Sequence, residues 1–333
     1  MKKIIAIFIA AVMLFTVFTA CSGDVVKKTN SKLSIVCTIF PEYDWVMEIL
    51  GDRADDVDVT LLLDNGVDLH NYQPTADDIV KISSCDMFIY VGGESDEWVD
   101  DVLKNAQNPD MIALNLIDIL GANAKEERVI EGMQVEEEHE NEEEHTQETE
   151  GEVEYDEHVW LSLINARLFC TRISEELAKL DSENAQTYID NGGAYVDKLN
   201  ELHNQFQQEI METGNINPVL LFADRFPFMY LTDDYGITYY AAFVGCSAET
   251  EASFETVKFL VEKVDELSLK YIMIIDGSTE ELAKTVISNT KDKNQQILVL
   301  NSMQTVTSAD RKSGSTYYSI MQSNLEVLKM ALS

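Results

Sequence analysis

Four polar side chains stand where predicted strands end or a predicted helix begins, and together they could bind a divalent cation. His70 follows an apolar run in LLLDNGVDLHNYQP, and His158 immediately precedes a predicted helix. Two carboxylates follow apolar runs directly, Asp224 after VLLF and Asp276 after YIMII. Open parallel sheets bind ligands beyond the carboxyl ends of their strands. Zn²⁺ accepts imidazole and carboxylate ligands, and Mn²⁺ accepts them with more oxygen. The four residues therefore predict a metal site built from both halves of the chain.

Each of these residues also has an ordinary structural explanation. A histidine in a loop is often only solvated, and an Asp before Gly, as at Asp276, often makes a turn. Asp224 can cap a helix or pair with Arg225. The combination favours a metal because the chain has only five histidines, and two of them stand at such positions. His203 lies in the middle of a helical pattern, where we expect an exposed structural residue.

No motif of a known enzyme class accompanies these residues. The sequence contains no HExxH, no GxSxG and no glycine-rich phosphate loop. The sequence therefore predicts a binding protein and not an enzyme, although a metallohydrolase would use the same His and Asp ligands and would be recognised by turnover.

Apolar runs alternate with helical patterns in both halves of the chain, which predicts an α/β fold. We expect a βα lobe at 33–180, a linking helix at 181–213 that is broken only at Gly192–Gly193, and a second βα lobe at 214–333. The chain of 333 residues is long enough for two such lobes. The runs predicted as strands are Leu33–Phe40, Val57–Leu63, Met87–Val91, Met111–Asn115, Val219–Phe222, Ile237–Ala242, Tyr271–Ile275 and Ile297–Leu300.

An acidic segment at 125–157 interrupts the first predicted lobe. It contains sixteen Asp or Glu residues, one Arg, and the histidines His139 and His145. Such a segment is too charged to fold by itself. It is either a solvated linker or a loop that collects cations. The net charge of −36 repels nucleic acid, so no nucleic-acid partner is expected.

The N-terminus predicts export. Lys2 and Lys3 precede the apolar run Ile4–Ala20, which is typical of a signal peptide over residues 1–20. Phe18-Thr19-Ala20-Cys21 resembles the bacterial lipobox, which implies a lipid on Cys21, a tether at 21–32 and a location at the outer face of the cytoplasmic membrane. An ordinary signal peptide with an incidental cysteine is the alternative. The cysteines predicted to be free thiols, and not disulfide partners, are Cys37, Cys85, Cys170 and Cys246.

Several segments resemble the metal-binding lipoproteins of bacterial ABC importers, the cluster A-I family. DLHNYQPTADDIVKISSCDMFIYVGGESDEWVDDVL resembles the segment around the family's first ligand, and EHVWLSLINARLF resembles the segment around its second. DDYGI, FETVKFLVEKVDEL and STYYSIMQSNLEVLKMAL resemble its C-terminal lobe. The resemblance covers nearly the whole mature chain. It implies two βα lobes joined by a rigid backbone helix, with a metal in the cleft between them.

Carried over residue by residue, the resemblance implies that His70 and His158 are metal ligands. The third position, five residues before Tyr230, is occupied by Arg225, which stays cationic and cannot be a ligand. Asp224 is then expected as its substitute, with Asp276 as the fourth ligand and Glu280 as the alternative.

Zinc-type members insert an acidic, His-bearing loop before the second ligand, so the resemblance also implies that 125–157 collects metal. The expected function is capture of Zn²⁺ for an ABC permease. The same role for Mn²⁺ and a metal-binding surface adhesin are the alternatives.

Overall fold

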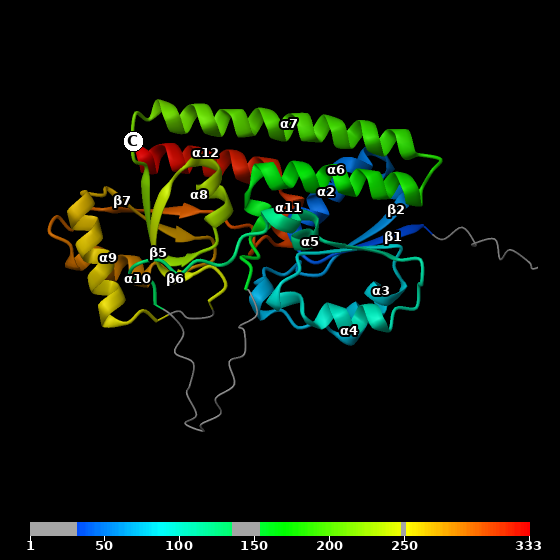
Figure 1. Cartoon of the computed structure of the whole chain (residues 1–333), viewed down its shortest axis with the longest axis horizontal. Coiled ribbons are helices and arrows are strands. Elements are labelled where there is room, and N and C mark those ends of the chain that lie inside the picture. The colour runs from blue at the N-terminus through cyan, green and yellow to red at the C-terminus, as the bar shows by residue number, and fades with distance from the viewer. Residues whose placement is uncertain (1–31, 135–153, 248–250) are drawn as a thin grey trace, which may run out of the picture. The chain divides into compact units, whose positions relative to one another are not determined.

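Eight parallel strands form two four-stranded sheets in this computed structural model, which describes residues 32–134, 154–247 and 251–333 (Figure 1). The first sheet has the order β2-β1-β3-β4, and the second has the order β6-β5-β7-β8. The prediction of an α/β fold with two lobes of parallel strands is confirmed. The strands are β1 (Leu33–Cys37), β2 (Val57–Leu61), β3 (Met87–Tyr90), β4 (Ile112–Asn115), β5 (Val219–Phe226), β6 (Thr238–Val244), β7 (Tyr271–Ile275) and β8 (Gln296–Leu300).

The inner strands β3 and β7 are continuous apolar runs, as expected for strands that are covered on both faces. All four residues of β3 are buried, as are four of the five residues of β7. One apolar core contains residues of both sheets, such as Ile35 and Met273. Two smaller clusters lie on the outer faces of the sheets, one around Phe88 and one around Ile274.

Helices follow the strands in both lobes, and side chains cap the starts of several of them, such as α3, α6 and α9. Thr75 caps α3, because its side chain accepts from the backbone N of Asp78 and the Asp78 carboxylate accepts from the backbone N of Thr75. Among the described residues the helices are α2 (Phe40–Leu50), α3 (Ala76–Ser84), α4 (Trp98–Lys104), α5 (Leu116–Leu120), α6 (Leu163–Leu180), α7 (Ala185–Glu212), α8 (Met229–Tyr235), α9 (Phe254–Leu267), α10 (Glu281–Asn289), α11 (Ser308–Lys312) and α12 (Tyr317–Leu332).

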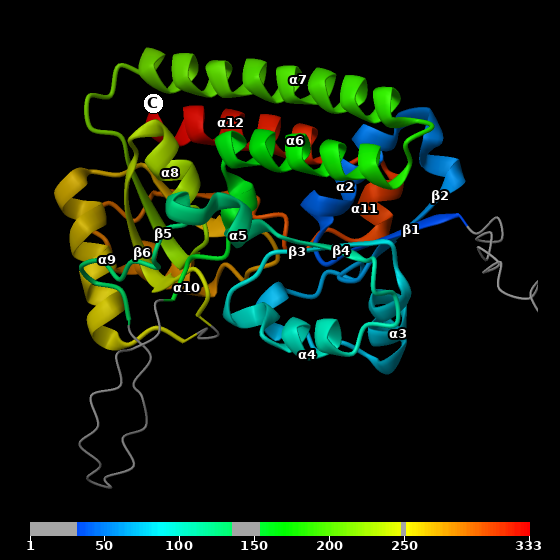
Figure 2. The ribbon, with the colours of Figure 1, turned by 45° about the vertical axis from the view of Figure 1, so that its right-hand side comes forward.

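Helix α7 runs alongside both sheets, with α6 and α12 beside it (Figure 2). Its 28 residues correspond to about 42 Å at the α-helical rise per residue. The predicted break at Gly192–Gly193 was wrong, because the helix continues through both glycines. A Cβ on Gly192 would lie 2.6 Å from the Ser174 Cβ of α6, so glycine allows the two helices to pack closely at this point.

The C-terminal helix α12 packs back against the first lobe. The backbone N of Tyr317 donates to Asp44 Oδ2 at 2.8 Å, and its hydroxyl donates to the Trp160 carbonyl at 2.8 Å. Its ring meets Trp45 edge to face at a centroid distance of 5.2 Å. The segment after β8 therefore belongs to the packing of both lobes.

Two sets of predictions lie outside the described residues. The first is the signal peptide at 1–20 with Cys21 and most of the tether, and the second is the part of the acidic loop that contains His139 and His145. Within the described part of the chain, no helix combines the length and the apolar character needed to cross a membrane.

Candidate metal centre

His70 stands on a short turn beyond the carboxyl end of β2. The 3₁₀ turn η2 (Leu69–Asn71) begins at Asp68, whose carboxylate accepts from the backbone N of His70 at 3.1 Å. The Nδ1 atom of His70 lies 2.9 Å from Ser95 Oγ and 3.2 Å from Glu157 Oε2. These contacts occupy Nδ1 and leave Nε2 as the nitrogen available to a ligand.

His158 immediately precedes the 3₁₀ turn η5 (Val159–Leu161) and has no exposed surface. The Asp156 carboxylate accepts from the backbone N of His158 at 2.8 Å and lies 3.1 Å from its Nδ1. The Trp160 ring packs 5.2 Å from the imidazole, centroid to centroid. Asp156 thus holds one nitrogen of this ring and sets the orientation of the other.

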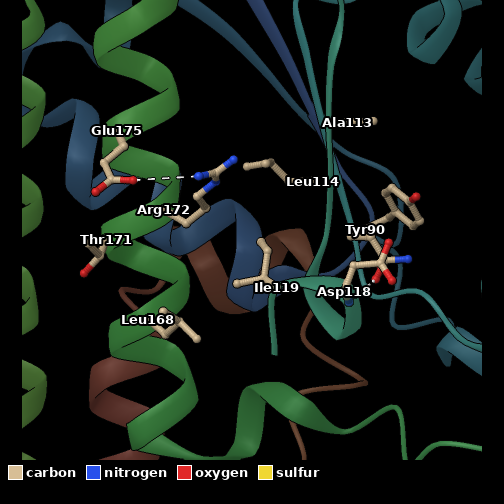
Figure 3. A pocket seen from close by; sticks show the side chains of 10 residues that line it. Tyr90, Ala113, Leu114, Asp118, Ile119, Leu168, Thr171, Arg172 and Glu175 are labelled. Carbon is tan, nitrogen blue, oxygen red and sulfur yellow. Dashed lines mark hydrogen bonds and ion pairs between the residues drawn. The ribbon is translucent and has the colours of Figure 1, made fainter. Parts of the chain in front are cut away.

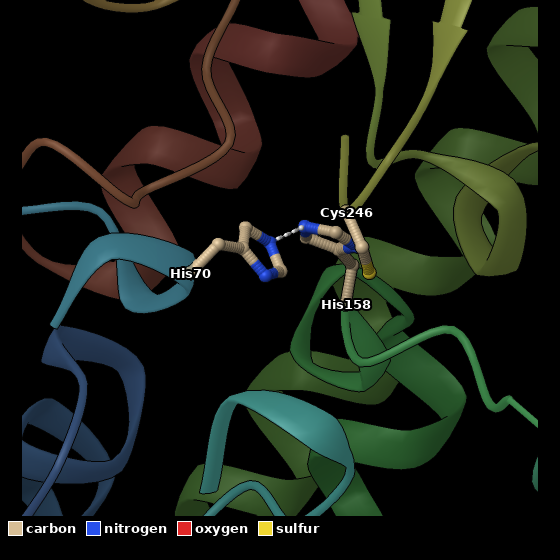
Figure 4. A group of neighbouring side chains, drawn as sticks. All are labelled: His70, His158 and Cys246. Atoms are coloured by element: carbon tan, nitrogen blue, oxygen red, sulfur yellow. Dashed lines mark hydrogen bonds between the residues drawn. The ribbon is translucent and has the colours of Figure 1, made fainter. Parts of the chain in front are cut away.

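The two imidazoles converge through their Nε2 atoms (Figure 4). The Nε2 atoms of His70 and His158 lie 3.1 Å apart. When each Nδ1 carries its proton toward the neighbouring carboxylate, the two Nε2 lone pairs face each other, and a cation between them stabilises this arrangement. Two nitrogens on a tetrahedral Zn²⁺, each about 2.0–2.1 Å from it, would be about 3.3 Å apart. The rings therefore fit a shared metal ion.

Carboxylates behind the rings add negative charge to this site. Burial raises the pKa of Glu157, but the contact with His70 and the hydrogen bond from Ser95 outweigh it, so the pKa lies below its ordinary value. Burial also raises the pKa of Asp68, but the Arg225 guanidinium outweighs this effect, so the pKa of Asp68 too lies below its ordinary value. Both carboxylates are therefore ionised at neutral pH, and they favour a cation beside the imidazoles.

Cys246 is a third potential ligand that the sequence analysis did not select. Among the described residues, ligand atoms of His70, His158 and Cys246 all lie within 4.8 Å of one another, and these three residues form a group that could hold a metal ion. Cys246 follows β6 by two residues, and its backbone N donates to Glu127 Oε1 at 3.1 Å. The strand-end argument that selected Asp224 and Asp276 applies equally to this cysteine and could have found it.

Gly245 allows the Cys246 segment to approach His158. A Cβ at position 245 would lie 3.0 Å from two atoms of the His158 ring and 2.9 Å from the Phe226 carbonyl oxygen. Any larger residue would force the segment away from the imidazole.

The structure does not bring the predicted third and fourth ligands to the histidines. Asp224 lies inside β5 and not after it, because the strand continues to Phe226 through an irregular register. Its carboxylate accepts from the backbone N of Arg225 at 2.8 Å and from the backbone N of Ile275 at 3.1 Å. The carboxylate oxygens therefore serve as acceptors for backbone N–H groups of β5 and β7.

Asp276 accepts from the backbone N and hydroxyl of Ser302 and from the Thr305 hydroxyl, which fixes the loop after β8. Glu280 is half-exposed and pairs with Lys284 at 2.8 Å. These contacts occupy the three carboxylates in this structure, and none of the three belongs to the group of ligand atoms formed by His70, His158 and Cys246 among the described residues.

Arg225 joins the two lobes beside the site. Its guanidinium pairs with the Asp68 carboxylate and donates to the Ser247 carbonyl at 3.4 Å. Gln304, in the loop after β8, donates from Nε2 to Asp68 Oδ1 at 3.2 Å and lies 3.3 Å from His158 Nε2. Both contacts connect residues of the second lobe to the turn that contains His70.

Other candidate residues lie away from this group. His203 is buried and not exposed as predicted, with Nδ1 3.0 Å from the Tyr235 hydroxyl. The prediction of free thiols is confirmed for the four described cysteines, of which Cys246 is the half-buried one. A separate cavity of about 510 Å³ lies beside α6 (Figure 3). Its lining residues offer two carboxylates and a guanidinium but no imidazole or thiol, and they are Tyr90, Ala113, Leu114, Asn115, Asp118, Ile119, Leu168, Thr171, Arg172 and Glu175.

Comparison with known proteins shows the family to which the chain belongs. The model of the ZnuA family, described as the periplasmic component A of zinc-uptake complexes, matches residues 35–331. The chain belongs to this family. The resemblance to the metal-binding lipoproteins of ABC importers is thereby confirmed.

Two curated relatives and a solved structure are similar over nearly the whole chain. The zinc-binding lipoprotein AdcA of Streptococcus pneumoniae strain R6 is 30% identical over 330 residues, which cover 99% of this chain and 61% of AdcA. The high-affinity zinc uptake system protein ZnuA of Bacillus subtilis is 28% identical over 335 residues, covering 99% of this chain and 98% of that protein. The crystal structure of Zn(II)-bound AdcA from S. pneumoniae superposes with a TM-score of 0.70 at 26% identity, covering 91% of this chain and 58% of AdcA. The chain thus spans about three fifths of AdcA.

Proposed function

We propose that this protein captures Zn²⁺ outside the cytoplasm and delivers it to the permease of an ABC importer. The observation that carries the proposal is the 3.1 Å approach of the two Nε2 atoms of His70 and His158. Each ring has its other nitrogen beside a carboxylate, which raises the basicity of the ligand nitrogen. The membership in a zinc-uptake family supports the same cargo.

Zinc fits the described ligand set better than manganese. Imidazole suits Zn²⁺, whereas Mn²⁺ favours carboxylate, carbonyl and water oxygen. The carboxylates predicted to supply that oxygen, Asp224 and Asp276, have other partners. The protein binds and releases its cargo without making or breaking covalent bonds in it, so we expect no enzymatic turnover.

The N-terminal segment would tether the protein at the outer face of the cytoplasmic membrane. This part of the proposal rests on the signal-like residues 1–20 and on Cys21 as the lipid acceptor. The relative AdcA is itself named a lipoprotein, which supports the same anchor here. Mass spectrometry of the membrane-extracted protein should find diacylglyceryl on Cys21. A mature chain that begins at another residue would contradict the anchor.

The acidic segment is proposed to collect cations near the site. Its carboxylates raise the local concentration of divalent ions, and His139 and His145 add transient imidazole ligands. The ends of the segment have a second role, because Glu127 accepts from the backbone N of Cys246 and Asp156 holds His158.

Calorimetric titration of the purified protein with Zn²⁺ tests the central proposal. We expect one zinc ion per chain and at least about 100-fold weaker binding in His70→Ala, since changes even behind a ligand cost about 10–100-fold. His203→Gln is the matched control, because it removes an imidazole that contacts Tyr235 and not the site. Absence of zinc binding by the unmodified protein, or equal binding by His70→Ala, would refute the function.

A further inference from the structure

The thiol of Cys246 shares the space in which the two imidazoles converge. Its Sγ lies within 4.8 Å of a ring nitrogen of His70 and of one of His158 (Figure 4). The other described cysteines, Cys37, Cys85 and Cys170, are buried elsewhere. Cys246 therefore differs from them in being placed beside two potential ligands.

Contacts on three sides hold the Cys246 segment in this position. The Glu127 carboxylate accepts from the backbone N of Cys246 at 3.1 Å, and Gly245 packs directly against the His158 ring. Arg225 donates to the carbonyl of the next residue, Ser247, while its guanidinium pairs with Asp68 at the start of the His70 turn. The same cation thus ties the thiol-bearing loop to the turn of the first ligand.

An orphaned polar atom borders the same group. The Gln304 side chain lies 3.3 Å from His158 Nε2 through its Nε2, and it is only 8% exposed. Its carbonyl Oε1 is buried without a hydrogen-bond partner among the described residues. The Gln304 amide thus adds a buried polar group beside His158, and its oxygen lacks a donor among the described residues.

We propose that the Cys246 thiolate is the third protein ligand of the metal, so that the site is a His₂Cys set. This inference rests on the proposed zinc-capture function and deepens it. A Zn–S bond of about 2.3 Å and Zn–N bonds of about 2.0–2.1 Å place sulfur and nitrogen about 3.6 Å apart in tetrahedral geometry, which the 4.8 Å group accommodates. The thiol proton passes to solvent as the Zn–S bond forms, and no oxidation state changes.

A thiolate ligand would determine which metal the site prefers. Soft sulfur selects zinc and disfavours manganese, which prefers hard oxygen ligands. Cys246 therefore makes the site selective for zinc, and the two histidines alone would discriminate less.

X-ray absorption of the zinc-loaded, full-length protein tests the ligand directly. We expect one sulfur scatterer at about 2.3 Å together with nitrogen or oxygen at about 2.0–2.1 Å. A shell of nitrogen and oxygen alone would overturn the proposal. This measurement needs no variant and decides the question even if a substituted chain does not fold.

Zinc affinity of Cys246→Ser, measured by competition with a chelator, provides the second test. We expect binding at least about 100-fold weaker than in the unmodified protein, and a smaller ratio of zinc to manganese affinity. Cys85→Ser is the matched control, because Cys85 Sγ donates to the Ile82 carbonyl and not to the site. Unchanged affinity in Cys246→Ser, with binding lost in His70→Ala, would overturn the thiolate ligand and leave the zinc function standing. Failure of the unmodified protein to bind zinc would overturn both.

Discussion

The hydrogen bond between Asp156 and His158 provides a quantitative test of the metal centre. Asp156 is 2% exposed, and its carboxylate contacts both the backbone N and the Nδ1 of His158. Asp156→Asn keeps the size of the side chain and an oxygen that can face these donors, but it removes the negative charge. The substitution therefore weakens the hold on the ring without removing a ligand.

The expected loss follows from the strength of the two kinds of hydrogen bond. A hydrogen bond to a charged group contributes about 1.5–3 kcal/mol, and a neutral one contributes about 0.5–1.5 kcal/mol. The difference of about 1–1.5 kcal/mol corresponds to about a tenfold change in an equilibrium constant. The loss of ligand basicity adds to it, so we expect zinc to bind about 10–100-fold more weakly.

Competition between the purified protein and a chromophoric chelator measures this change. Asp181→Asn is the control, because it removes the same charge from a carboxylate that contacts Tyr188 and Asn184. Equal zinc affinity in Asp156→Asn and the unmodified protein would refute the reasoning. The same weakening in Asp181→Asn would refute it too, because the effect would then come from net charge.

Three further predictions concern stability, packing and the acidic loop. Burial and the nearby Asp96 raise the pKa of Glu42 to about 8, so the folded chain keeps a proton that the unfolded chain loses near pH 4.5. Between about pH 4.5 and 8, this group should lower the free energy of unfolding by about 1.4 kcal/mol for each unit of rising pH. Urea unfolding of Glu42→Gln at several pH values should lack this contribution of Glu42. Gly245→Ala should weaken zinc binding in the chelator assay by displacing the segment from His158, whereas Gly193→Ala, which has open space around it, should not. Deletion of residues 135–153 should leave the equilibrium affinity for zinc unchanged and slow zinc uptake by cells at limiting metal; equal uptake would contradict a collecting role.

The α/β fold could be predicted because it depends on patterns that are local in the chain. The run MFIY is apolar at every position, and a strand covered on both faces requires that pattern. The start of α3 could be located because Thr75 and Asp78 cap it through neighbouring backbone groups. The break expected at Gly192 was wrong, since close packing of α6 explains that glycine and a helix end does not.

The site could be predicted only in part, because contacts between distant segments form it and local patterns do not reveal them. His70 and His158 stood out as rare residues at strand-end and helix-start positions, and the structure brings them together across 88 positions of sequence. Asp156 and Glu157 looked like two more acids of a charged run, and only folding places them behind the imidazoles. Asp156 reaches His158 only two residues along the chain, whereas Glu157 reaches His70 only once the distant segments have packed.

The sequence by itself determined the alternation of strands and helices and singled out the two imidazoles, because hydrophobic periodicity and rare residue types are properties of the chain. The tertiary structure decided which third group meets those imidazoles. Asp224 is drawn into β5 by backbone donors, and Cys246 is brought to His158 by the close approach of Gly245. A ligand set is a matter of distances of a few ångströms between distant segments, and those distances exist only once both lobes are packed.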